Sequence, residues 1–250
     1  MGYSWDLVGR YSTSLSLVYH DSLFSFNHGQ SCSAGSRIFV QSSIYNEFLE
    51  RFTTRAKGIK LGDPFTPGTH QGPQISQVQY DRIMSYVRSG KEEGATCHLG
   101  GDRFGTEGFY IYPTIFTDVK PNMRIMKEEI FGPIAVVVKF ETEEGEIQFV
   151  LSFRKTDKSL GCSEVIKEAN ESPYGLAAGV FTSNIRRAIS ATRMLQAGTV
   201  WVIFLISSFE TRIHLFLQVN CANILQIQVP FGGYKQSGFG RECGAYALNK

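Results

Sequence analysis

The sequence predicts an α/β fold, with a mostly parallel sheet flanked by helices. Windows with apolar residues at helical spacing alternate along the chain with short apolar runs. The run Ile134-Ala-Val-Val-Val is apolar on both faces, which is typical of a covered strand in a parallel sheet. The chain has 250 residues, 42% hydrophobic and 19% charged, which is enough for one large globular domain or two small ones.

The first elements alternate as such a fold requires. Residues 37–41 predict a strand, and Ser43 is expected to cap the helix that follows. The apolar face of this helix comprises Ile44, Phe48, Leu49, Phe52 and Ala56. After a Gly/Pro-rich loop over 62–73, a second amphipathic helix is expected to end near Gly90 or Gly94. Its apolar positions are Tyr80, Ile83, Met84 and Val87.

The second half of the chain continues the pattern. A helix is predicted over residues 184–195, between the last two of four strands. The predicted strands are 110–116, 134–140, 176–182 and 199–203.

Two segments, 145–163 and 203–219, interrupt the alternation. Without the first, Thr142 would stand three places before Glu164, which forms a capping box at the head of an amphipathic helix. Without the second, a short strand would run directly into Asn220. We interpret both segments, together with residues 1–25, as translated non-coding sequence; the alternative is that the two internal segments are genuine surface insertions, which loops tolerate.

Composition and charge argue against several function classes. The net charge of +2, without a dense basic cluster, predicts no nucleic-acid partner. The five cysteines have no CxxC pair and the five histidines no ligand spacing, so neither a disulfide framework nor a metal site is expected. The longest apolar run, 200–206, is too short to span a membrane. With no signal-peptide pattern at the N-terminus, we expect a cytoplasmic protein.

Cys32 is the most distinctive residue of the chain. It stands among small residues, in Gly-Gln-Ser-Cys-Ser-Ala-Gly. Such a setting leaves the sulfur open to an electrophilic carbon and brings backbone N–H groups close to the oxyanion that would form. The other interpretation is a buried cysteine that acts as a small hydrophobe.

Six distinctive blocks follow one another along the chain. They are Asn27-His-Gly-Gln-Ser-Cys-Ser-Ala-Gly-Ser-Arg37, Gln71-Gly-Pro-Gln74, Lys127-Glu-Glu-Ile-Phe-Gly-Pro133, Tyr174-Gly-Leu-Ala-Ala178, Ala197-Gly-Thr-Val-Trp201 and Pro230-Phe-Gly-Gly-Tyr-Lys-Gln-Ser-Gly-Phe-Gly-Arg-Glu242. In this order the blocks resemble the NAD(P)-dependent aldehyde dehydrogenase family. The resemblance covers the chain from about Phe26 to Lys250, apart from the two interrupting segments, and corresponds to the C-terminal half of a family chain.

The resemblance implies roles for five residues. Cys32 would be the thiolate that adds to the aldehyde, with its own backbone N–H as one oxyanion donor. Glu129 would accept hydrogen bonds from the hydroxyls of the nicotinamide ribose, and Phe131 would lie against the nicotinamide side of the cofactor. Gln79 matches a position near the same ribose. Phe231 would form a wall of the substrate channel, although a structural role is an equal alternative.

The resemblance also implies the domain organisation and partners. Residues 26–250 would form an aldehyde dehydrogenase catalytic domain, preceded by an aberrant segment over 1–25. The cofactor would be NAD or NADP, and the partners a small-molecule aldehyde and either further copies of the chain or a full-length relative. The family's cofactor-binding fold and its glutamate general base belong to the half that the resemblance does not cover.

Three functions are therefore weighed. The first is an oxidoreductase that converts an aldehyde to a carboxylic acid through a cysteine thiohemiacetal and thioester. The second is a catalytically inactive fragment or faulty gene model that acts at most as a partner of a full-length relative. The third is a thioesterase-like cysteine hydrolase. We expect these 250 residues alone to show no measurable dehydrogenase activity.

Overall fold

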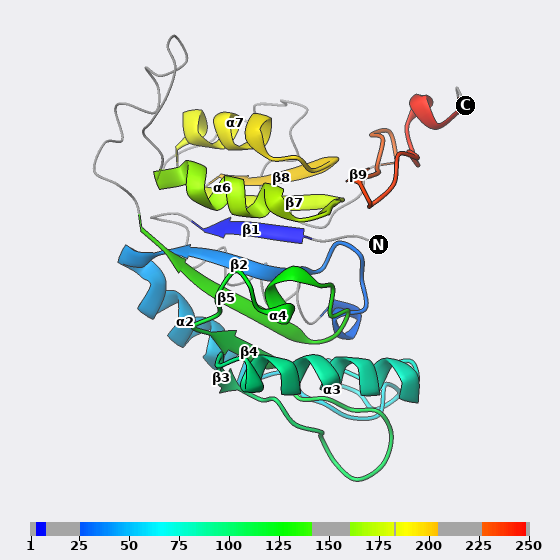
Figure 1. The fold of residues 1–250 in the computed structure, drawn as a ribbon. Coiled ribbons are helices and arrows are strands. Elements are labelled where there is room, and N and C mark those ends of the chain that lie inside the picture. The colour runs from blue at the N-terminus through cyan, green and yellow to red at the C-terminus, as the bar shows by residue number, and fades with distance from the viewer. Residues whose placement is uncertain (1–3, 9–25, 142–160, 183, 205–226, 249–250) are drawn as a thin grey trace.

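The computed structural model describes residues 4–8, 26–141, 161–182, 184–204 and 227–248 (Figure 1). The strands are β1 Ser4–Val8, β2 Gly35–Gln41, β3 Thr96–Leu99, β4 Thr114–Thr117, β5 Ile134–Phe140, β6 Tyr174–Gly175, β7 Ala177–Thr182, β8 Thr199–Phe204 and β9 Tyr234–Lys235. The helices are η1 Phe26–Gly29, α2 Ser42–Lys57, α3 Gln77–Glu92, α4 Arg124–Lys127, α6 Gly161–Glu171, α7 Ile185–Met194 and η3 Ala245–Leu248.

Seven strands form one sheet in the order β3-β4-β5-β2-β1-β7-β8. All neighbouring pairs are parallel except β3 with β4, which is antiparallel. β6 and β9 form a separate antiparallel pair. The predicted α/β class with a mostly parallel sheet is confirmed.

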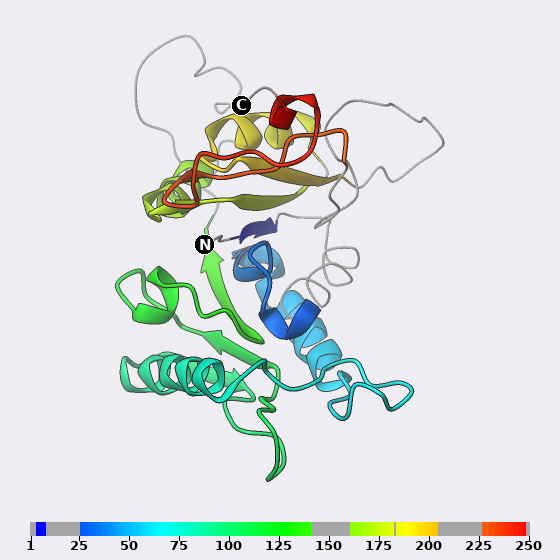
Figure 2. The same cartoon turned by 90° about the vertical axis from the view of Figure 1, so that its right-hand side faces the viewer.

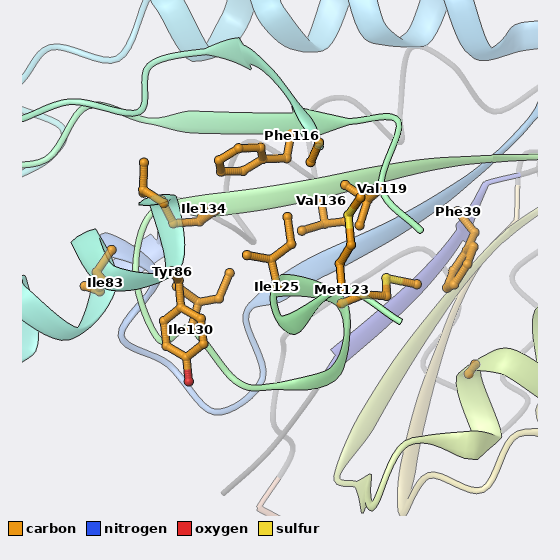
Figure 3. Packing of buried hydrophobic residues seen from close by; sticks show 14 of the residues in the cluster. Phe39, Ile83, Tyr86, Phe116, Val119, Met123, Ile125, Ile130, Ile134 and Val136 are labelled. Atoms are coloured by element: carbon orange, nitrogen blue, oxygen red, sulfur yellow. The ribbon is translucent and has the colours of Figure 1, made fainter. Parts of the chain in front are cut away.

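Helices cover both faces of this sheet. Alternate side chains of each strand point to opposite faces, so one strand contributes to the core on both sides. On one face, Phe39 of β2 and Val136 of β5 pack with α3, α4 and α6 (Figure 3). On the other face, Ile38 and Val137 pack with α2. Figure 2 shows α2 and α3 on opposite sides of β4 and β5. A third cluster joins α6 and α7 to β7 and β8.

Most of the predicted helices and strands are present, with shifted ends. α2 begins at Ser42, and Gln41 occupies its N-cap without a side-chain bond, so the prediction of Ser43 as the cap is wrong. The reason is that β2 runs directly into the helix and leaves no loop for a capping residue. α3 ends at Glu92, just before Gly94. α7 is capped by Asn184, whose side chain accepts bonds from two backbone N–H groups.

The predicted strand over 110–116 is shorter than expected. β4 starts at Thr114, and Ile111 makes only an isolated bridge to Arg103. Pro113 lies between them and has no N–H to donate to a ladder, which interrupts the strand. β3 was not predicted, because its four residues alternate between exposed and half-buried and carry little apolar signal.

The described N-terminal residues, Ser4–Val8, form a strand of the main sheet. β1 lies in the middle of the sheet, parallel to both β2 and β7. Without it, both of those strands would present unpaired backbone groups to each other, which is costly in a core. The sheet therefore includes residues from the segment that was expected to be aberrant. The non-coding origin of that segment stays a prediction.

The two interrupting segments fall mostly outside the described residues. The first, 145–163, reaches into α6, which begins at Gly161. The second, 203–219, overlaps the last two residues of β8. The capping position at Thr142 also lies outside the described part of the chain. The origin of both segments stays a prediction.

Candidate active site

The segments that carry four of the five predicted site residues meet one edge of the sheet. Cys32 precedes β2, and Glu129 and Phe131 precede β5. Phe231 adjoins Gly232, whose carbonyl approaches the residue before β8. Because β2, β5 and β8 run in the same direction, their first residues lie at the same edge. Gln79 approaches from α3.

The loop before Cys32 packs directly against the Glu129–Phe131 segment. A Cβ atom on Gly29 would lie 1.9 Å from the carbonyl oxygen of Gly132, so the two backbones are in contact. Asn27, His28 and Gly29 all have positive φ, which turns the chain sharply toward this contact. Burial lowers the pKa of His28. Only glycine fits at position 29, and that fit fixes where the cysteine loop lies.

Cys32 is exposed on the turn that follows. The N–H of Ala34 donates to the carbonyl of Ser31 at 3.1 Å, which closes the turn around the cysteine. Within the described part of the chain, the Cys32 N–H donates to no backbone carbonyl. The structure thus favours the open cysteine over the buried hydrophobe among the two interpretations of Cys32.

Arg37 links the cysteine strand to the segment before β5. Its side chain is 1% exposed, and its Nε donates to the carbonyl of Met126 at 2.6 Å. Its Nη2 donates to the carbonyl of Glu128. A buried guanidinium that bonds two carbonyls holds the chain immediately before Glu129 against β2.

Gln79 contacts the same segment from the other side. It lies in the first turn of α3, where its N–H donates to the N-cap hydroxyl of Ser76 at 3.2 Å. Its side-chain Nε2 donates to the carbonyl of Phe131 at 2.8 Å. The structure therefore brings Gln79 to the backbone of Phe131. Its predicted place beside a ribose stays a prediction.

Glu129 is half-buried, and one of its carboxylate oxygens, Oε1, is buried. Its backbone carbonyl accepts a bond from Arg82 Nη2 at 3.3 Å. Three side chains thus bond carbonyls along this short stretch, from Arg37, Arg82 and Gln79. Together these three bonds fix the backbone on which the side chains of Glu129 and Phe131 stand.

The neighbouring Glu128 belongs to a small polar network. Its Oε2 accepts bonds from the Tyr86 hydroxyl at 2.9 Å and from Arg124 Nε at 3.1 Å. The Arg124 guanidinium also lies over the Tyr86 ring, 4.1 Å from its centre. Burial alone would raise the pKa of Glu128, but these bonds outweigh it and lower the pKa.

Phe231 is half-buried and packs against the core on the α2 face. Its backbone exchanges two bonds with Glu242, at 2.7 and 2.8 Å. This placement fits the structural role that was weighed for Phe231. Its role as a wall of the substrate channel stays a prediction.

Sequence reasoning missed the residues that hold the site together, above all Arg37 and Arg82. Arg37 did carry a usable signal, because it is the one charged residue in the strand Gly-Ser-Arg-Ile-Phe-Val-Gln. A charge inside a buried strand requires partners. Arg82 is a surface position on a helix and carried no comparable signal.

A cavity of 410 Å³ lies beside this network, between the end of α4 and the end of α6. Its lining includes Glu128, Glu168, Glu171 and Tyr174. Glu168 is half-buried, and its Oε1 is buried with no hydrogen-bond partner among the described residues. Burial, and then the charge of Glu171, raise the pKa of Glu168.

Glu168→Gln is expected to stabilise the protein at neutral pH. A raised carboxyl pKa means that the ionised form opposes folding above that pKa, and that this penalty disappears as the pH falls below the ordinary glutamate pKa. We expect Tm to rise by about 2 °C near pH 7 and the gain to vanish in acid. Thermal unfolding across pH measures this, with the exposed Glu50→Gln as the control. A gain that persists in acid would contradict the electrostatic cause.

The described residues contain no group of three or more His, Cys, Asp or Glu side chains placed to hold a metal ion. Over the same ranges, no helix has the length and apolar character that a membrane crossing requires.

Known proteins match this chain closely. The model of the aldehyde dehydrogenase family matches residues 20–250, which begins six residues before the expected boundary. An aldehyde dehydrogenase from Agaricus bisporus is 53% identical over 224 residues, covering 90% of this chain and 38% of the relative. A mitochondrial benzaldehyde dehydrogenase from Antirrhinum majus is 46% identical over 229 residues, covering 92% of this chain and 36% of the relative.

A solved aldehyde dehydrogenase structure has the same fold over nearly all of this chain. The aldehyde dehydrogenase from Bacillus cereus in its NAD+ complex superposes with a TM-score of 0.82 at 38% identity. The match covers 99% of this chain and 43% of that protein. The chain thus spans less than half the length of these three proteins. With a family match over nearly all of its residues, this chain belongs to the aldehyde dehydrogenase family.

Proposed function

We propose that this chain takes part in the oxidation of an aldehyde to a carboxylic acid with NAD or NADP, with Cys32 as the nucleophile. The observation that supports this most is the position of the exposed cysteine turn. The Gly29–Gly132 contact holds that turn against the segment of Glu129 and Phe131. The proposed nucleophile and the proposed cofactor-binding residues, Glu129 and Phe131, therefore lie on segments that are in contact at the same edge of the sheet.

The proposed chemistry starts at the sulfur. The Cys32 thiolate adds to the carbonyl carbon, a C–S bond forms, and the carbonyl π electrons move to oxygen. The Cys32 N–H, which bonds no backbone carbonyl within the described ranges, would donate to that oxyanion. Once the carbon is oxidised to the thioester level, water releases the acid and regenerates the thiol. A bound nicotinamide cofactor supplies the hydride acceptor.

Glu129 and Phe131 would hold that cofactor. A carboxylate only accepts hydrogen bonds, which suits the two hydroxyls of a ribose. The aromatic side chain two residues later offers an apolar surface to a planar ring. A carboxylate that accepts hydrogen bonds, followed two residues later by an aromatic ring, therefore fits the ribose hydroxyls and the planar ring of a nicotinamide riboside. The NAD+ complex of the Bacillus cereus relative supports a cofactor of the NAD type, and the proposal covers both NAD and NADP.

The substrate and partners follow from the family. We propose a small-molecule aldehyde as the substrate, and either further copies of this chain or a full-length relative as the protein partner. We also propose a cytoplasmic location.

A second candidate function is a non-catalytic chain that acts only with a full-length relative. It concerns the 250 residues by themselves, which span 38% of the Agaricus bisporus relative. Loss of a general base slows a reaction of this kind by about 10²- to 10⁴-fold.

The test is NADH formation from a simple aldehyde by the purified chain. The matched pair of variants is Cys32→Ala and Cys243→Ala. Turnover that is lost in the first and kept in the second supports the oxidoreductase. No turnover in either variant or in the wild type supports the non-catalytic chain. Hydrolysis of an aryl ester without NAD, also lost in Cys32→Ala, would instead indicate a cysteine hydrolase.

A further inference from the structure

Phe131 has a backbone conformation that a bulky residue rarely adopts. Its φ is +60°, in the left-handed region, and among the described residues no other Phe, Tyr or Trp has a positive φ. For a residue with a Cβ atom, this conformation costs roughly 1–2 kcal/mol. Such an outlier persists only where the surroundings hold it, and it often marks a functional position.

Gln79 supplies the hydrogen bond at this position. Its Nε2 donates to the Phe131 carbonyl at 2.8 Å, which is the carbonyl whose direction the left-handed turn sets. Gln79 is itself on a rigid support, because the helix packs through Ile83, Tyr86 and Val87, all at most 2% exposed. The Gln79 amide is therefore held in place by the packing of α3.

The next residue is fixed as well, so the strain is confined to Phe131. A Cβ atom on Gly132 would lie 2.6 Å from the side chain of Ile83, and its carbonyl meets Gly29 on the other side. The N–H of Ile134 donates to the Gly132 carbonyl at 2.7 Å, which ties the turn to the start of β5. At the Phe131–Gly132 peptide itself, the carbonyl accepts the bond from the Gln79 side chain, whereas Arg37 and Arg82 bond carbonyls earlier in the segment.

We propose that Gln79 is a positioning residue, whose hydrogen bond keeps Phe131 left-handed and so directs the Phe131 ring and the adjoining Glu129. In the right-handed or extended conformation, the carbonyl turns away from α3 and the ring points elsewhere. The consequence for cofactor binding rests on the proposed function. The effect of the Gln79 hydrogen bond on the Phe131 backbone does not depend on the proposed function.

Amide hydrogen exchange, measured on the whole chain, tests whether the Gln79 hydrogen bond stabilises the backbone at Phe131. Gln79→Ala removes the side chain, and Gln79→Glu keeps its size but removes the donor at neutral pH. A net hydrogen bond of about 1 kcal/mol corresponds to roughly fivefold faster opening. We expect the backbone amides of residues 129–132 and of Ile134 to exchange about fivefold faster in both variants than in the wild type.

Gln77→Ala is the matched control. Gln77 lies on the same turn of α3, but its Nε2 bonds the Asp81 carboxylate at 2.7 Å on the exposed side. We expect no change at residues 129–134 in this variant. Unchanged exchange in Gln79→Ala, a change in Gln77→Ala as large, or wild-type exchange in Gln79→Glu would each overturn the proposal.

Measuring the Kd for NAD+ distinguishes the effect of Gln79 on the Phe131 backbone from the proposed function. We expect the Kd for NAD+ to rise about fivefold in both Gln79 variants, while the rate at which iodoacetamide alkylates Cys32 stays at the wild-type value. Faster exchange with an unchanged Kd would overturn the positioning role. If the wild type binds no NAD+, the proposed function fails for this chain, and the exchange result alone decides whether Gln79 holds Phe131.

Discussion

Cys32→Ala is expected to abolish any turnover of aldehyde or ester that the chain shows, by at least about 10³-fold. The alanine has no sulfur with which to form the C–S bond, and the two other described cysteines are half-buried, whereas Cys32 is exposed. Burial also raises the pKa of the Cys97 thiol, which lowers its thiolate fraction. The measurement is the initial rate of product release at saturating substrate.

Cys243→Ala is the control for this substitution. Cys243 has a φ of +62°, a strain that cysteine and alanine share, so the replacement changes the thiol without changing the backbone cost. We expect its rate to remain within twofold of the wild type. Equal losses in the two variants would mean that the substitutions act through folding and not through a nucleophile.

Gly29→Ala is expected to destabilise the protein by about 3 kcal/mol or more, combining overpacking with an unfavourable φ. The added methyl would lie 1.9 Å from the Gly132 oxygen and 2.2 Å from its carbon, and backbone atoms cannot yield as a flexible side chain can. The cysteine loop and the Glu129–Phe131 segment must then separate. Chemical denaturation measures the loss of unfolding free energy.

Gly105→Ala isolates the backbone part of that effect. Gly105 has a φ of +69°, against +70° at Gly29, but a Cβ atom there meets nothing within 4 Å. We expect this variant to lose only about 1 kcal/mol, the cost of an alanine in the left-handed region. If Gly29→Ala loses no more than the control, the contact between the two loops does not hold the site together.

The parts of the site that follow from local sequence were predictable. The small residues around Cys32 indicated an open thiol, and the apolar run from Ile134 indicated a buried parallel strand. The amphipathic spacing of Tyr80, Ile83 and Val87 gave α3. In each case, neighbours in the sequence carry the signal.

The parts that depend on contacts between distant residues were not predictable. Arg37 bonds the carbonyls of Met126 and Glu128, which lie 89 and 91 residues away in the sequence. No local pattern encodes such a pairing. Gln79 lies 52 residues before Phe131, and its amide bonds a backbone carbonyl, which carries no residue-specific signal. The left-handed turn at Phe131 also had no signal, because a phenylalanine does not favour that conformation.

The place of β1 illustrates the same limit. Its five residues were too few to show a period, yet they complete the hydrogen bonding of two neighbouring strands. Tertiary context, and not local propensity, decides such a strand.

Protection of Cys32 by an aldehyde would show whether this thiol is the nucleophile. The chain is incubated with increasing benzaldehyde, treated briefly with iodoacetamide, and mapped by peptide mass spectrometry. We expect alkylation of Cys32 to slow to a plateau as aldehyde occupies the thiol, while labelling of Cys97 and Cys243 does not change. Labelling of Cys32 that is independent of aldehyde, or that slows in parallel with the other two cysteines, would contradict its assignment as the nucleophile.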